Sequence, residues 1–138
     1  VAARLTDVAG SSDVFLGSVV AYSNDVKVRR LGVPPEVLER YGAVSEETAA
    51  AMAQGARKEL GADVALAVTG VAGPDGGTAE KPVGLVYLHA EAPSGSSQRG
   101  VVLPGDREAV RARATTLALH VLRSLLSPSV TDARASSA

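Results

Sequence analysis

Two long segments with helical periodicity, 45–61 and 106–126, are separated by short apolar runs, and this alternation restricts the possible folds most. In the first segment, Ser45 can cap the helix N-terminus and Gly61 can end the helix. The second segment carries an apolar stripe along one face and has Asp106 at its N-cap position. Amphipathic helices that alternate with strand-like runs predict an α/β fold. We expect a three-layer-like sandwich in which helices cover a central, mostly buried sheet.

The apolar runs have the length and composition of β-strands. We expect strands within residues 14–22, 63–73, 82–92 and 95–105. The run 14–22 is apolar on both faces, which is typical of a central strand. Two shorter helices complete the prediction: residues 1–8 resemble the second half of a helix, and 33–42 has proline near its first turn and glycine at its end.

The chain of 138 residues is long enough for one domain with its own core, which we place at residues 1–127. The tail, 128–138, shows no periodicity and is predicted to be disordered. Because the sequence contains no cysteine, disulfides, thiolate metal sites and cysteine nucleophiles are excluded. The two histidines, His89 and His120, are too few for a typical histidine metal site, and we interpret both as structural. No motif indicates a metal or an organic cofactor.

The charges sum to a formal net charge of −1, which argues against nucleic acid or a membrane surface as a partner. No apolar run is long enough to cross a bilayer and no signal peptide is recognisable, so we expect a cytoplasmic protein. Val1, Leu5 and Val8 would form an apolar stripe on the first helix. A second subunit would cover this stripe, and we therefore expect a homo-oligomer.

A glycine-rich loop, 70–81, follows the predicted strand 63–73 and is the first candidate for a ligand site. Its spacing matches neither the phosphate-binding loop of nucleotide hydrolases nor the dinucleotide-binding fingerprint. Thr69 and Gly70 at the strand end could offer a hydroxyl and backbone N–H groups to a ligand. A simple hairpin connection explains the same glycines equally well.

Tyr22 ends the run 14–22, Lys27 follows five positions later, and the two form a second candidate. A lysine that is partly buried at a strand end has a lowered pKa and can act as the base for a hydroxyl nucleophile. Tyr22 would then bind the substrate or orient the lysine. The alternatives are a solvated Lys27 beside Arg29 and Arg30, and a tyrosine at the rim of the core with its hydroxyl in water.

Arg107 and Arg111 lie one turn apart on the predicted helix 106–126 and share a face. A cation in the first helical turn, such as Arg107, opposes the helix dipole, and an anionic ligand such as phosphate would explain its position. Salt bridges to Asp106 or Glu108 explain it equally well.

Three strings, AYSNDVK (21–27), VTGVAGPDGGTAEKPVG (68–84) and GDREAVR (105–111), make the chain resemble the CinA C-terminal domain. The similarity extends from Val1 to about Leu126. That family includes the stand-alone PncC-type nicotinamide-nucleotide amidohydrolases. The resemblance therefore implies an α/β sandwich with its site at strand ends, and a hydrolase that converts nicotinamide mononucleotide into nicotinic acid mononucleotide and ammonia.

The resemblance also implies roles for individual residues. Tyr22 and Lys27 correspond to the tyrosine and the lysine of the active site, with Lys27 as the base. Thr69 and Gly70 fall on the loop that contacts the substrate amide or its developing oxyanion. An arginine of GDREAVR would bind the 5′-phosphate, and Arg107 and Arg111 both remain candidates.

The family's nucleophile is a serine in an S-C-T-G-G segment that would precede Val1, and no serine of this chain replaces it. Because loss of a nucleophile lowers the rate by several orders of magnitude, we expect this chain to be a poor catalyst by itself. A non-catalytic nucleotide-binding or interaction domain is therefore the alternative function. A purely structural oligomerisation module would bind no ligand, and it is favoured least because polar side chains gather at the strand ends.

Overall fold

The computed structural model describes residues 1–127. In that part of the chain the elements are, in order, α1 (Ala2–Thr6), the short 3-10 helix η1 (Ser11–Asp13), α2 (Asn24–Leu31), α3 (Pro35–Tyr41), α4 (Glu46–Leu60), β1 (Ala65–Gly70), β2 (Leu85–Ala92), β3 (Gly95–Val102) and α5 (Arg107–Leu126). Ser45 and Asp106 cap α4 and α5 as predicted, because each side chain accepts a hydrogen bond from a backbone N–H of the first helical turn. The predicted disordered tail, 128–138, lies outside the described residues.

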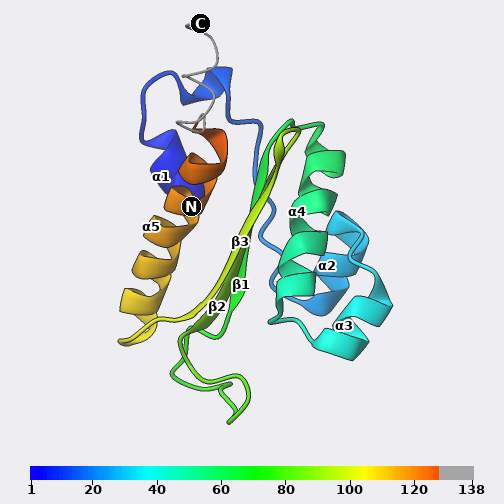
Figure 1. Ribbon diagram of the computed structural model, residues 1–138, viewed down its shortest axis with the longest axis vertical. Coiled ribbons are helices and arrows are strands. Elements are labelled where there is room, and N and C mark those ends of the chain that lie inside the picture. Colours follow the sequence, from blue (N-terminus) through cyan, green and yellow to red (C-terminus); the bar gives the residue numbers. More distant parts are fainter. Residues whose placement is uncertain (128–138) are drawn as a thin grey trace, which may run out of the picture.

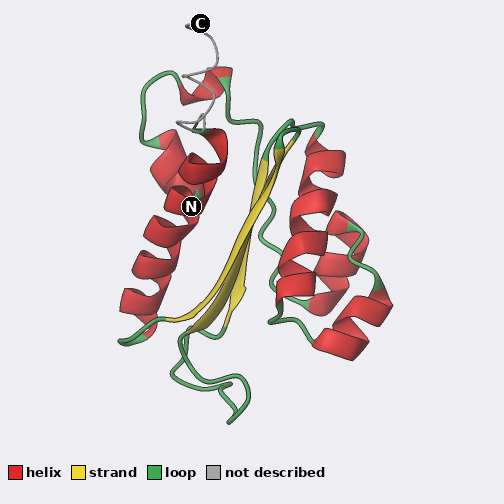
Figure 2. Cartoon of the chain, viewed as in Figure 1, coloured by secondary structure: helices red, strands yellow, loops and turns green. Residues whose placement is uncertain are grey.

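The three strands form one antiparallel sheet with β2 in the middle. Thr69 of β1 lies opposite Tyr87 of β2, and Leu88 of β2 lies opposite Arg99 of β3. Helices α1 and α5 lie on one side of the sheet, and α2, α3 and α4 lie on the other (Figure 1). Helix, sheet and helix thus form three layers (Figure 2), which confirms the predicted α/β sandwich.

The core between the sheet and α5, here called the α5-side core, is built from one strand and one helix. It consists of Val86, Leu88, Ala90, Val110, Ala114, Ala118 and Val121. Alternate residues of β2 and residues three or four apart on α5 supply it, because these spacings bring side chains to one face of each element. In the same layer, α1 contacts α5: Arg4 of α1 donates a hydrogen bond to the hydroxyl of Thr116 on α5 at 2.9 Å.

The core on the opposite side, here called the α4-side core, joins α2 and α4 to β1. It consists of Leu31, Val33, Met52, Ala53 and Ala67. The two helices approach most closely at Gly55 of α4, where an added Cβ would lie 1.7 Å from the carbonyl oxygen of Leu31. No side chain fits at that distance, so the glycine sets the separation of α2 from α4.

Residues 14–22 are extended but do not form the predicted central strand. Val19 and Ala21 pack against the α4-side core, whereas Val20 and Tyr22 are 81% and 82% exposed. None of the strands in the described part of the chain pairs with this segment. An apolar run indicates extended chain, but pairing depends on a partner that the run itself does not identify.

Two further features concern the same residues, 1–127. No helix there is both long enough and apolar enough to cross a bilayer. No three or more His, Asp or Glu side chains are grouped so that they could hold a metal ion. His89 is buried inside β2, and its Nδ1 has no hydrogen-bond partner within the described residues.

Candidate active site

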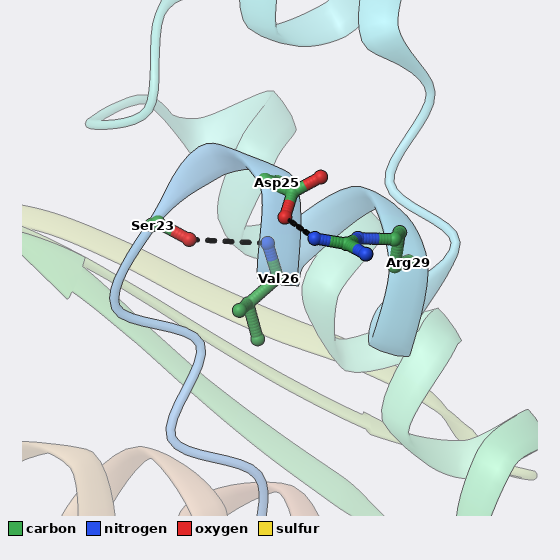
Figure 3. A network of polar contacts seen from close by, with 4 residues as sticks. All are labelled: Ser23, Asp25, Val26 and Arg29. Carbon is green, nitrogen blue, oxygen red and sulfur yellow. Dashed lines mark hydrogen bonds and ion pairs between the residues drawn. The ribbon is translucent and has the colours of Figure 1, made fainter.

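Lys27 lies on a helix that the sequence analysis did not predict. Helix α2 begins after Ser23, whose Oγ accepts a hydrogen bond from the backbone N–H of Val26 at 3.2 Å (Figure 3), and it ends at Gly32, which has a φ of 61°. Ser23 and Gly32 are the sequence signals that mark the start and the end of this helix. They were overlooked because the apolar run 14–22, which precedes them, favoured a strand. The expected position of Lys27 at a strand end is therefore wrong, because the residue belongs to the first turns of α2.

The exposed side of α2 carries an ion pair between Asp25 and Arg29 (Figure 3). The hydrogen bond to Asp25, together with its negative charge, raises the pKa of the Arg29 guanidinium. Both side chains are mostly exposed, so the pair contributes little to stability. The solvated alternative considered for Lys27 thus describes Arg29 instead.

Lys27 itself is only 5% exposed. Its Nζ donates hydrogen bonds to the carbonyl oxygens of Ala21 at 3.0 Å and Tyr22 at 3.4 Å. No carboxylate forms an ion pair with this ammonium among residues 1–127. Burial lowers the pKa of Lys27, because removal from water disfavours the charged form. A lowered pKa increases the fraction of neutral amine, which is the form that can accept a proton.

The side chain of Tyr22 contacts Arg107 of α5. The Tyr22 hydroxyl accepts a hydrogen bond from Nη2 of Arg107 at 3.3 Å, and Nη1 of Arg107 donates to the carbonyl of Gly73 at 2.9 Å. Three segments far apart in the sequence, namely the end of 14–22, the glycine-rich loop and the start of α5, therefore meet at one guanidinium. Tyr22 was considered either to bind the substrate or to orient Lys27. Its hydroxyl lies where it can contact a ligand held by Arg107, which favours substrate binding. The hydrogen bond from Lys27 reaches the backbone carbonyl of Tyr22 and not its hydroxyl.

The two arginine candidates differ in their surroundings. Arg107 forms no ion pair with Asp106 or Glu108 in the described structure, so the salt-bridge explanation of its position is not observed. Asp106 instead caps α5 by accepting a hydrogen bond from the N–H of Ala109 at 2.9 Å. Arg111 is exposed, and its side chain has no hydrogen-bond partner within residues 1–127. The structure thus brings Arg107, and not Arg111, into contact with the other candidate residues.

Thr69 and Gly70 end β1, but the Thr69 hydroxyl is already engaged. Its Oγ1 donates to the carbonyl of Ala43 at 2.6 Å, which uses its single hydroxyl proton. The N–H of Val71 donates to the carbonyl of Leu85 at 2.8 Å. Because bonded and free positions alternate along an antiparallel strand, the N–H of Gly70 points away from β2, toward the edge of β1 that has no strand partner among the described residues.

Two surface hollows of the described residues lie away from Tyr22, Lys27, Thr69 and Arg107. One, of about 440 Å³, is lined by Val26, Arg29 and Arg30. The other, of about 280 Å³, lies near His89 and Glu91, at the end of β2 remote from Gly70. Tyr22 and Arg107 are exposed, so both side chains can be reached from solvent.

Comparison with known proteins identifies the family and the fold of the chain. The sequence profile of the CinA C-terminal domain matches residues 1–126. The chain belongs to the CinA C-terminal domain family. It is 54% identical over 130 residues to a CinA-like protein of Mycolicibacterium paratuberculosis, an alignment that covers 91% of this chain and 30% of that protein. A CinA-like protein of Kosmotoga olearia is 50% identical over 130 residues, covering 94% of this chain and 32% of its own length.

Solved structures of the CinA family have the same fold. The competence/damage inducible protein CihA from Agrobacterium tumefaciens is 44% identical, with a TM-score of 0.89 over 91% of this chain and 78% of that chain. A CinA superfamily protein from Escherichia coli is 35% identical, with a TM-score of 0.86 over 91% of this chain and 73% of its own. The chain spans only about 30% of the length of the curated CinA relatives that it matches.

Proposed function

We propose that this CinA domain, as part of the intact protein, hydrolyses the amide of nicotinamide mononucleotide to nicotinic acid mononucleotide and ammonia. The observation that carries the proposal is the state of Lys27: a buried amine with a lowered pKa, held by the carbonyl oxygens of Ala21 and of Tyr22, whose hydroxyl contacts Arg107. A neutral lysine amine can replace histidine as the base for a serine nucleophile.

In the proposed reaction, the neutral Lys27 amine takes the proton of a serine hydroxyl while the serine oxygen attacks the amide carbon. By resemblance to the family, this serine would lie in a segment ahead of Val1. The amide nitrogen leaves as ammonia after it receives the proton from Lys27, and a water molecule then hydrolyses the acyl-enzyme to release the carboxylate and regenerate the serine. Atoms and charge balance without any cofactor.

The other candidate residues would bind the substrate. The free N–H of Gly70 can stabilise the oxyanion that develops on the amide oxygen, which favours this backbone group over the engaged Thr69 hydroxyl. Arg107 can bind the 5′-phosphate, since its guanidinium is exposed and forms no ion pair in the described residues. The Tyr22 hydroxyl next to it would supply a further hydrogen bond.

One observation favours a second candidate function for residues 1–127. The proposed binding groups Tyr22 and Arg107 are in contact with each other. A domain that binds a nucleotide without hydrolysing it would need only these groups. Such a domain would be stabilised by the nucleotide and would release no ammonia.

Ammonia release from nicotinamide mononucleotide tests the proposal. The 138-residue chain is compared with a longer version that carries the S-C-T-G-G segment ahead of Val1. We expect only the longer version to be active, and Lys27→Met in it to lower kcat by about 10²- to 10⁴-fold, the usual contribution of a general base. Binding without turnover in both versions would support the second function. Turnover by the 138-residue chain alone would contradict the serine mechanism. The mechanism to test next would then be attack by a water molecule with Lys27 as its base.

A further inference from the structure

The turn between α3 and α4, residues 41–45, accepts hydrogen bonds from several distant side chains. The carbonyl of Tyr41 accepts from Nζ of Lys81 at 2.6 Å, and the carbonyl of Ala43 accepts from Thr69 at 2.6 Å. The carbonyl between them, that of Gly42, accepts from the hydroxyl of the fully buried Thr48 at 2.7 Å. Three consecutive carbonyls of one turn are therefore bound by side chains from the glycine-rich loop, from α4 and from β1.

Lys81 ends the glycine-rich loop and is fixed on the loop side as well. Its backbone N–H donates to the hydroxyl of Thr78 at 3.0 Å, and the N–H of Thr78 donates to the carbonyl of Lys81 at 2.9 Å. This closed turn couples the Lys81 side chain to the loop backbone. The loop is thus attached at two places, at Gly73 by Arg107 and at Lys81 by the α3–α4 turn.

Gly42 makes room for the Lys81 ammonium. A Cβ at position 42 would lie 2.8 Å from Nζ of Lys81, and the φ of Gly42 is 78°, a conformation that other residues rarely adopt. Lys81 is half-buried, and it forms no ion pair in the described residues. Its contact with the Tyr41 carbonyl supplies a donor to the end of α3, where carbonyl groups have no partner within the helix.

From these contacts we infer that Lys81 is a positioning residue, whose ammonium holds the glycine-rich loop and the α3–α4 turn in the arrangement that binds the nucleotide. The turn holds Thr69, the neighbour of Gly70, while the loop presents Gly73 to Arg107, so both substrate-binding edges depend on this contact. Lys81 does not touch the reacting atoms. The inference rests on the proposed function, because the loop is assigned to the substrate there.

The test compares Lys81→Met with Lys81→Arg and with Lys58→Met, which removes an exposed lysine from α4. We measure the Kd for nicotinamide mononucleotide in the 138-residue chain, the hydrogen exchange of amides 72–80 and the urea midpoint. We expect Lys81→Met to raise the Kd about tenfold, since a charge-assisted hydrogen bond is lost, and to speed exchange in the loop. Lys81→Arg should restore most of the affinity, because it keeps a cation that can donate to the Tyr41 carbonyl.

A Kd for Lys81→Met equal to that of the wild type would overturn the inference. An increase in the Kd for Lys58→Met as large as that for Lys81→Met would overturn it as well. In the longer version that is proposed to be catalytic, the same substitution should raise KM and leave kcat within about threefold, because Lys27 is untouched. If neither the 138-residue chain nor the longer version binds nicotinamide mononucleotide, the proposed function fails on its own account. The exchange data then decide the loop contact separately: faster exchange in Lys81→Met that Lys81→Arg restores supports it, and unchanged exchange overturns it.

Discussion

The two cores of the molecule differ in what they hold in place. The α5-side core is apolar throughout and joins the middle strand to one long helix. The α4-side core lies where α2 crosses α4 at Gly55, and the buried Lys27 lies one helical turn before its member Leu31. The difference indicates that the middle of the first core, at Leu88, supplies mainly stability, whereas the second core also fixes α2, which carries Lys27 and directly follows Tyr22 and Ser23. Substitutions in the two cores should therefore separate stability from ligand binding.

The largest change in stability is expected for Leu88→Ala in the α5-side core. Leu88 is 1% exposed, so truncation would leave a cavity and lower the free energy of unfolding by about 2–5 kcal/mol. Urea denaturation measures the change, and Leu126→Ala, at a leucine that is 53% exposed, is the control with an expected change of about 0.5 kcal/mol or less. Weaker nucleotide binding by Leu88→Ala under conditions where it is folded would contradict the separation of the two cores.

A smaller loss of stability, combined with an effect on binding, is expected for Gly55→Ala in the α4-side core. Alanine is the better helix former by about 1 kcal/mol, but its Cβ would meet the carbonyl oxygen of Leu31 and force α2 away from α4. We expect a net loss of about 1–3 kcal/mol in the free energy of unfolding, together with weaker binding of nicotinamide mononucleotide, because Tyr22 directly precedes α2 and moves with it. The neighbouring exposed residue provides the control, Gln54→Ala, which should change neither quantity. A stability gain in Gly55→Ala would show that the two helices can separate without cost.

The same contrast explains how much of the fold the sequence predicts. The α5-side core follows from local periodicity, since 82–92 and 106–126 were predicted as a strand and a helix and contain β2 and α5. Local signals predict such elements because a strand and a helix each repeat their buried positions at a fixed spacing. The layers of the sandwich follow from the order of these elements.

The candidate site was only partly predictable, because its contacts join residues that are far apart. Tyr22 and Arg107 were both candidates, but their contact across 85 positions has no local sequence signal. Helix α2 was missed although Ser23 and Gly32 mark its ends, and the role of 14–22 was misjudged because pairing of a strand depends on its partner. The contact of Lys81 with Tyr41, 40 positions away, could not be predicted from the loop itself.

The smallest effect, and the most specific for the α4-side core, is a dependence of stability on pH that Lys27 causes. Burial lowers its pKa below the ordinary value of 10.5, so at low pH both states are protonated and the full cost of burying the ammonium is present. Between the lowered pKa and 10.5, the unfolded chain binds more protons than the folded one, and stability therefore rises as the pH increases through this window. The slope cannot exceed about 1.4 kcal/mol per pH unit for a single group.

Urea denaturation of the wild type and of Lys27→Met over this pH range isolates the contribution, with Lys58→Met as the control for loss of an exposed lysine. We expect the difference in free energy of unfolding, wild type minus Lys27→Met, to rise with pH, and no such rise for Lys58→Met. A difference that falls instead would mean that the carbonyls of Ala21 and Tyr22 stabilise the ammonium by more than its burial costs. Lys27 would then stay charged at the pH of the reaction, and a charged lysine cannot accept the proton of a serine, so that result would also remove it as the base.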